Sequence, residues 1–174
     1  MKKITAISVQ KKSPNRVNIY LDGEFAFGMA RITAVWLKNG DELSDEKIAR
    51  LLAEDTREWA YQQALLYLSY RVRSEKEIRQ NLQKHEMPEE VIEETLERLR
   101  KAGLANDNKF AQTWVENRST FRPRSRRALE MELRQKGLDD ETVHAAVSGV
   151  DENALAYDSA IKRVNRLKGS ALSK

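Results

Sequence analysis

The sequence predicts a mainly α-helical protein of tandem three-helix repeats, two complete and a third partial, preceded by a small three-stranded β meander with a helix. Three observations support this prediction. Residues 1–28 alternate between apolar and polar side chains, the chain after about residue 55 has the apolar spacing of helices, and its apolar positions recur after 51 residues. The expected parts are the β meander with its helices (1–54), the two repeats (55–104 and 105–151) and the partial repeat (152–174).

Turn signals at 13–15 (SPN) and 22–23 (DG) divide the alternating segment into three strands. A sheet this small needs an apolar partner to be stable. We expect that partner in the next segment, whose large apolar residues are Ile32, Val35 and Trp36. Ser44 should then cap a helix, whose inner stripe is Ile48, Leu51 and Leu52.

Each complete repeat should contain three helices, which in the first copy cover about residues 57–70, 75–85 and 89–102. Ser74 with Glu77 forms a capping-box pattern, and Gly103 suits a left-handed C-cap. A shift of 51 residues superposes the apolar positions of the two copies, while the polar positions differ. The matching pairs are Trp59/Phe110, Ala60/Ala111, Ile78/Leu129, Leu82/Leu133, Met87/Leu138, Ile92/Val143 and Leu96/Val147.

The sequence also predicts where the second and third copies begin. Asn106 should cap the first helix of the second copy, and a third copy begins near Glu152 with the pattern of one helix. The aromatic residues fall at helical spacing, which favours packing between helices over a stacking platform for nucleobases. They are Trp59, Tyr67, Tyr70, Phe110, Trp114 and Phe121.

The composition excludes several classes of protein. The 174 residues include no cysteine, so neither disulfides nor thiolate metal sites are available. No segment has the roughly 20 apolar residues of a membrane span, and His85 and His144 lack partners at metal-ligand spacing. No catalytic trio or phosphate-binding loop is recognisable. We therefore expect a cytoplasmic, monomeric protein that is not an enzyme and needs no cofactor or metal.

The most informative motif is written twice, as YRVRS at 70–74 and FRPRS at 121–125, each just before a helix. In a chain with this much charge, an arginine pair commonly lies in a solvated loop between helices. This pair, however, recurs at the same phase of the repeat. In the second copy Arg126 and Arg127 also lie in the first turn of a helix, where positive charge opposes the helix dipole by about 0.3 to 1 kcal/mol. Stability alone would favour acidic residues there.

This pattern favours a surface that binds an anion or an acidic partner. The formal net charge is only +4, yet residues 116–136 carry seven Arg or Lys against three Glu. Pro123 stiffens the loop in the second copy. The predicted binding residues are Arg71, Arg73, Arg118, Arg122, Arg124, Arg126 and Arg127.

Three stretches resemble the RecX family of bacterial recombination regulators: ALLYLSYRVRSEKEIRQNL, VIEETLERLRKAGLANDNKFAQTWVENR and ELRQKGLDDETV. The likeness is strongest over residues 60–147, where R-x-R-S-x-x-E precedes an L-x-x-x-G-L-x-[ND]-D-x-x-F-A run. The opening ITAISVQKKSPNRVNIYLDGEFAFG is similar to the N-terminal extension of some members. The short third repeat departs from the family pattern, whose members usually complete it.

The resemblance implies a protein that binds the RecA recombinase, lies along the groove of its filament on single- or double-stranded DNA, and inhibits filament growth, ATP hydrolysis and strand exchange. Its role would be in DNA recombination, DNA repair and the SOS response. Repeated arginines suit a partner that itself repeats, because weak contacts then add through effective concentration.

Two other functions remain open. One is a plain DNA-binding protein whose helix over 126–136 lies in a major groove, although Glu130 and Glu132 interrupt its positive face. The other is a passive helical scaffold.

Overall fold

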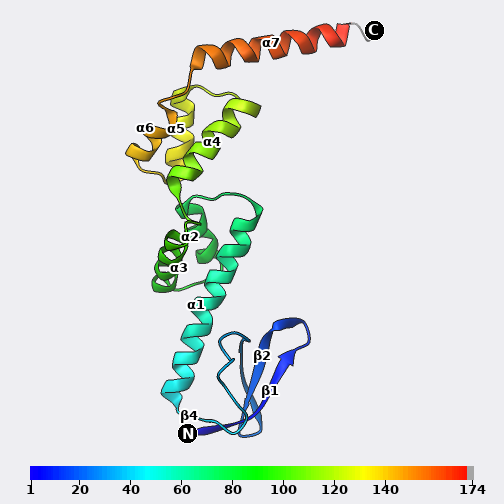
Figure 1. Cartoon of the computed structure of the whole chain (residues 1–174), viewed down its shortest axis with the longest axis vertical. Coiled ribbons are helices and arrows are strands. Elements are labelled where there is room, and N and C mark those ends of the chain that lie inside the picture. The colour runs from blue at the N-terminus through cyan, green and yellow to red at the C-terminus, as the bar shows by residue number, and fades with distance from the viewer. Residues whose placement is uncertain (172–174) are drawn as a thin grey trace. The chain divides into compact units, whose positions relative to one another are not determined.

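The computed structural model of the chain describes the backbone of residues 1–171 and the side chains of residues 1–167. Figure 1 shows a small N-terminal sheet followed by helices, which confirms the predicted fold class. The described residues divide into two compact units: unit 1 is Met1–Tyr67 with Leu82–Glu97, and unit 2 is Leu68–Asn81 with the chain from Arg98 onward. No helix among the described residues has both the length and the apolar character needed to cross a membrane.

The sheet of unit 1 consists of the three predicted antiparallel strands and one short addition. Its strands are β1 (Lys2–Gln10), β2 (Ser13–Leu21), β3 (Glu24–Ala30) and β4 (Glu42–Leu43), in the order β3-β2-β1-β4. Asp22 and Gly23 have φ angles of 52° and 92°, which are the left-handed values that a tight hairpin turn requires. The two-residue β4 pairs with Lys2 and Lys3 and was not predicted.

The prediction that Ile32, Val35 and Trp36 cover the sheet is wrong. Their exposed fractions are 70%, 64% and 84%. Residues 31–36 form successive tight turns, in which the amides of Thr33 and Ala34 both donate to the carbonyl of Ala30. In this segment Ala34 is the residue that packs into the sheet core. Ile48 and Leu51 of the following helix also pack against that core.

The helix that follows is α1 (Asp45–Tyr70), a single helix of 26 residues where the sequence had indicated separate helices near 45–52 and 57–70. Ser44 caps it as expected, because its hydroxyl accepts from the amide of Lys47 at 3.2 Å. The segment between the two expected helices contains no Gly or Pro, so nothing stops the first one. Leu52, assigned to the inner stripe, is exposed.

Asp55 of α1 attaches the helix to the sheet. Its side chain is buried, pairs with Arg16 of β2 at 3.0 Å, and accepts a hydrogen bond from the amide of Ala30 at 2.6 Å. Arg16 also donates to the carbonyl of Gly28 at 3.1 Å. One carboxylate therefore satisfies a strand-end amide and a guanidinium at once, and its removal would leave both without a partner.

The other six helices are α2 (Glu75–Lys84), α3 (Glu89–Lys101), α4 (Asp107–Phe121), α5 (Arg126–Gln135), α6 (Asp140–Val147) and α7 (Glu152–Ala171). The two predicted triplets and the first helix of a third are thereby confirmed. Asn106 caps α4 through the amide of Lys109, and Gly103 has a φ of +69°. The repeat prediction also holds inside each copy: Ile78, Leu129, Leu82 and Leu133 are all completely buried.

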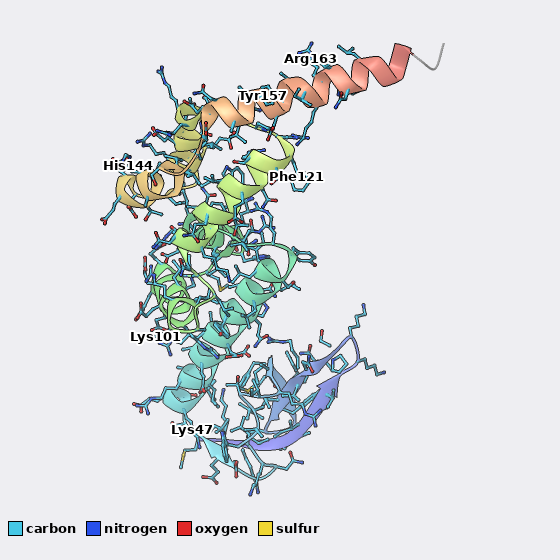
Figure 2. All side chains as sticks on the ribbon, turned by 45° about the horizontal axis from the view of Figure 1, so that its top comes forward. Lys47, Lys101, Phe121, His144, Tyr157 and Arg163 are labelled. Carbon is cyan, nitrogen blue, oxygen red and sulfur yellow. The ribbon has the colours of Figure 1, made fainter. Side chains whose placement is uncertain are left out.

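The aromatic residues divide into packed and exposed members. Phe110 is buried and stacks on Trp114 with ring centroids 5.6 Å apart, and Trp59 lies edge-on to His85 at 5.3 Å. The prediction fails for Tyr70 and Phe121, which are 75% and 77% exposed. Each is the last residue of its helix, so its side chain projects where the chain turns away (Figure 2 labels Phe121).

We predict that Asp55→Ala lowers the free energy of unfolding of unit 1 by about 3 kcal/mol, because Arg16 and the Ala30 amide lose their shared partner. Urea unfolding followed by circular dichroism measures the change, and hydrogen exchange over residues 24–30 should become faster. The matched control is Glu54→Ala, an exposed neighbour on the same helix, which should change stability by less than about 0.5 kcal/mol. Equal effects of the two substitutions would contradict this account of the anchor.

Candidate partner-binding surface at the arginine corners

The seven predicted binding residues all lie in unit 2, at two helix corners. Arg71 and Arg73 occupy the loop from α1 to α2, and the remainder lie along the end of α4, the α4–α5 loop and the first turn of α5. Ser125 caps α5 by accepting from the amide of Ala128 at 3.3 Å. The corners are therefore equivalent in sequence phase, but their side chains differ in what they contact.

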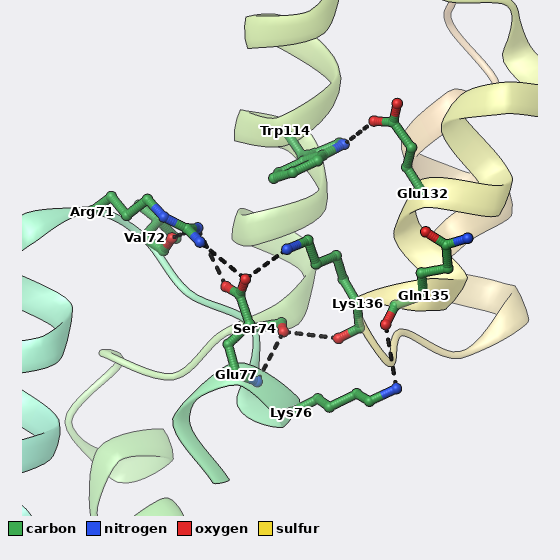
Figure 3. Close-up of polar contacts among 9 residues, drawn as sticks. All are labelled: Arg71, Val72, Ser74, Lys76, Glu77, Trp114, Glu132, Gln135 and Lys136. Carbon is green, nitrogen blue, oxygen red and sulfur yellow. Dashed lines mark hydrogen bonds and ion pairs between the residues drawn. The ribbon is translucent and has the colours of Figure 1, made fainter. Parts of the chain in front are cut away.

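Arg71 is not free, contrary to expectation (Figure 3). Its guanidinium donates to both carboxylate oxygens of Glu77 at 2.9 and 3.2 Å and to the carbonyl of Val72 at 3.0 Å. The same carboxylate pairs with Lys136, at the end of α5, at 2.7 Å. Glu77 thus holds two cations, and its carboxylate serves this cluster where the sequence indicated a capping role.

Ser74 completes the same cluster through its hydroxyl, which is fully buried. The hydroxyl accepts from the amide of Glu77 at 3.3 Å, as the capping pattern predicted, and donates to the carbonyl of Lys136 at 2.8 Å. Lys76 reaches the carbonyl of Gln135 at 3.2 Å (Figure 3). The start of α2 is therefore fastened to the α5–α6 turn, inside unit 2, by three polar contacts.

Arg73, the second arginine of this corner, is half-buried, and its Nε is withdrawn from solvent. An arginine in this position has little surface to present to a partner. Arg73 is therefore less accessible to a partner than the exposed arginines of the motif, and its role in binding stays a prediction.

Arg118 is committed to an internal carboxylate in the second corner. Its Nε donates to Glu132 at 2.7 Å, and its guanidinium carbon lies 4.7 Å from the centre of the Trp114 ring. The indole N–H of Trp114 donates to the same carboxylate at 2.8 Å (Figure 3). Arg124 lies 3.9 Å from the other oxygen of Glu132, a longer contact made by an exposed side chain.

Arg126 serves the fold through the segment between α6 and α7. Its guanidinium donates to the carbonyl of Val150 at 2.7 Å, while its backbone amide donates to Glu152 of α7 at 2.7 Å. The unfavourable charge in the first turn of α5 is thus offset by a carbonyl acceptor and by a carboxylate at the helix N-terminus.

Two of the seven arginines keep the predicted character. Arg122 and Arg127 are exposed, and within the described part of the chain their side chains form no hydrogen bond or ion pair. They flank the exposed Phe121 and the α4–α5 loop. The uncommitted positive charge of the motif is therefore confined to the second corner.

The alternative of a DNA-reading helix over 126–136 finds little support in these contacts. Arg134 pairs with Asp140 at 2.8 Å and lies 3.5 Å from Glu130. Lys136 is held by Glu77 and Arg126 by a backbone carbonyl. Arg127 is the one basic side chain of α5 that is uncommitted among the described residues, and one guanidinium does not make a groove-reading face.

The sequence alone did not identify Glu77, Glu132 and Lys136, whose contacts determine which arginines are paired inside the protein. A comparison of the two copies gives a signal for them, because the network residues occupy positions at which the copies differ. Glu77 corresponds to Ala128, and Lys136 corresponds to His85. A charged residue that appears in one copy only has a role that the shared packing does not explain.

Burial and neighbouring charges shift two acidic groups of unit 2 in opposite directions. Burial raises the pKa of Glu77, but the hydrogen bonds and charges of Arg71 and Lys136 outweigh it, so the pKa lies below its ordinary value. Burial raises the pKa of Asp107, whose Oδ1 accepts from the amide of Glu75 at 2.9 Å, with the charges of Glu75 and Asp139 adding to the rise.

Comparison with known families gives three matches along the chain. The regulatory protein RecX N-terminal domain matches residues 2–44, the RecX first three-helix domain matches 60–99, and the RecX second three-helix domain matches 106–147. A "Regulatory protein RecX" of Oceanobacillus iheyensis is 35% identical over 100% of this chain and 72% of its own length. That of Bacillus subtilis is 37% identical over 94% of this chain and 62% of its own length.

Solved structures give the same likeness. A crystal structure of regulatory protein RecX has a TM-score of 0.77 at 32% identity and covers 97% of this chain and 85% of its own. A crystal structure of RecX from Lactobacillus salivarius has a TM-score of 0.59 at 26% identity, covering 67% of this chain and 77% of its own. The chain thus spans about two thirds of the length of the curated relatives named above.

We predict that two glycines with the same backbone conformation differ in how they tolerate a methyl group. Gly137 (φ +90°) lies against Lys76, and an added Cβ would approach that residue's Cβ to 2.7 Å, whereas Gly103 (φ +69°) faces open space. Gly103→Ala should cost about 1 kcal/mol from backbone strain alone. Gly137→Ala should cost about 2 to 3 kcal/mol because it also displaces the first turn of α2. Urea unfolding measures both, and equal costs would contradict the fastening described above.

We also predict that Glu77 governs part of the acid sensitivity of unit 2. Because its pKa is lowered in the fold, its contribution to stability is complete above its unfolded pKa and is lost as pH falls through the folded value, below 4.5. Asp107 acts oppositely, since a raised pKa favours the protonated form in the fold. Glu77→Gln should therefore reduce the loss of unfolding free energy on acidification, and Asp107→Asn should increase it. Parallel pH profiles for the wild type and Glu77→Gln would refute the assignment.

Proposed function

The chain belongs to the RecX family of regulatory proteins, and on that premise we propose that it binds the RecA recombinase filament on DNA and inhibits filament extension, ATP hydrolysis and strand exchange. Its role is then in the control of recombination and DNA repair, including the SOS response. It acts by binding and carries out no reaction of its own, in keeping with the name "regulatory protein" that its relatives carry.

The observation that carries the proposal is the uncommitted charge of the second corner. Arg122 and Arg127 are the two predicted binding residues whose guanidinium groups have no partner among the described residues. A guanidinium that is already paired gains little from a second acidic partner, whereas a free one gains a full charge-assisted hydrogen bond. The arginines of the first corner, by contrast, stabilise the fold and are not assigned to the filament.

The filament offers two sources of negative charge for these groups, the acidic side chains of RecA and the phosphates of DNA. Both accept bidentate hydrogen bonds from guanidinium. An exposed aromatic side chain beside the arginines, Phe121, adds apolar contact area of the kind enriched at binding interfaces. We assign the primary contact to RecA, because a single basic side chain on α5 gives a weak DNA surface.

Salt dependence separates this proposal from plain DNA binding. The affinity of a protein that binds free DNA through many phosphate contacts falls steeply as the salt concentration rises, with or without RecA. If the chain binds free single- or double-stranded DNA as tightly as it binds the filament, with the same steep salt slope, the DNA-binding alternative holds and the proposal is wrong.

We predict that Arg122→Ala combined with Arg127→Ala raises the concentration needed to suppress single-stranded-DNA-dependent RecA ATPase by at least about tenfold, because two charge-assisted contacts are lost. The matched control is Lys11→Ala with Lys12→Ala, which removes the same charge from the exposed β1–β2 turn. Circular dichroism should show an unchanged helical fold in both. Unchanged suppression by the arginine variant, or an equal loss in the lysine variant, would refute the assignment.

A further inference from the structure

A cavity of about 330 Å³ lies beside the uncommitted corner, between residues 71–72 and helix α4. Its inner surface is apolar and is formed by the buried Phe110 with the half-buried Val72 and Trp114. The exposed ring of Phe121 lines it as well. The volume is at the small end of the range for ligand pockets, which suits one large side chain better than a whole small molecule.

The rim of this cavity is strongly positive. Three arginines line it, Arg71, Arg118 and Arg122, and no acidic residue does. Two carboxylates pair with rim arginines, and each holds two cations: Glu77 holds Arg71 and Lys136, and Glu132 holds Arg118 and Arg124. Of the three rim arginines, Arg122 has no carboxylate partner among the described residues.

The indole of Trp114 is poorly arranged for a nucleobase. The ring of Trp114 already has Phe110 stacked at 5.6 Å, with Arg118 and Lys136 at 4.7 and 5.0 Å from its centre. Its N–H is used by Glu132, and the amide of Asn117 donates to the carbonyl of Thr113 at 2.8 Å. A base would find the indole ring already in contact with three groups and its one N–H donor already in use.

We propose that this cavity binds an acidic peptide segment of the partner protein through one large apolar side chain flanked by carboxylates. The apolar side chain enters against Phe110, Val72 and Trp114, and an adjacent Asp or Glu meets Arg122. An apolar anchor in a pocket with charged residues at the rim is the usual arrangement of the residues that dominate binding energy. The inference rests on the proposed function only for the identity of the partner, because the peptide chemistry follows from the cavity itself.

Binding of short peptides to the full chain tests this inference without RecA. The probe is a fluorescein-labelled peptide of sequence GDEFDEG, measured by fluorescence anisotropy at low salt, where charge pairing is strongest. Two comparison probes are GDEADEG, which lacks the anchor, and GKKFKKG, which reverses the charge. We expect GDEFDEG to bind about tenfold or more tightly than GDEADEG, from burial of the aromatic ring, and GKKFKKG to show no binding.

Paired protein variants locate the site. Arg122→Ala should weaken GDEFDEG binding about tenfold, whereas Arg50→Ala, an exposed arginine of α1 that does not line the cavity, should leave it unchanged. Thr113→Phe, which fills the cavity from α4, should weaken binding with Arg122 still present.

The inference is overturned if the two arginine variants lose affinity equally, if GDEADEG binds as well as GDEFDEG, or if a single-stranded thymidine oligonucleotide binds in an Arg122-dependent manner while the peptide does not.

The outcomes separate the cavity proposal from the proposed function. Peptide binding at the cavity without any effect on RecA ATPase contradicts the proposed function alone, and ATPase suppression without peptide binding contradicts the cavity alone.

Discussion

The ion pair that joins Glu77 to Arg71 and Lys136 is the interaction on which the arrangement of unit 2 depends. A guanidinium from the preceding loop and an ammonium from the end of α5 both lie within 2.7 to 3.2 Å of this carboxylate in the first turn of α2. Ser74 also donates to the carbonyl of Lys136, so the first turn of α2 is held in one position against the α5–α6 turn. Leaving either cation without Glu77 would cost more than the pair contributes on its own, because a partly buried charge would remain unpaired.

This pairing also decides which arginines are available to a partner. The motif places positive charge at two corners, and internal carboxylates then neutralise most of it: Glu77 engages Arg71, and Glu132 engages Arg118. The remaining guanidinium groups form a small, specific surface. Such sorting would suit the proposed contact with a DNA-bound filament, since non-specific affinity for nucleic acid grows with the number of free cations.

The fold was predictable from the sequence because it depends on local signals. Alternation, caps and the 51-residue recurrence report packing directions that any helix or hairpin must satisfy. The site was predictable only in outline. Which arginine is free depends on carboxylates of other helices, such as Glu132 of α5 for Arg118 of α4, and no spacing rule within one helix encodes those contacts. The exposure of Trp36 was also not predictable from composition. Its segment is apolar enough to cover the sheet, but tight turns direct this side chain into solvent.

Internal carboxylates divide the arginines into a structural group and a group that we propose faces the partner. Chemical modification with phenylglyoxal, quantified residue by residue by mass spectrometry, tests this division directly in the free protein and on the RecA filament. We expect Arg122 and Arg127 to react quickly when free and to be protected on the filament, and Arg71 and Arg118 to react slowly in both states. Equal rates for all four in the free protein, or no protection of Arg122 and Arg127 on the filament, would contradict the account.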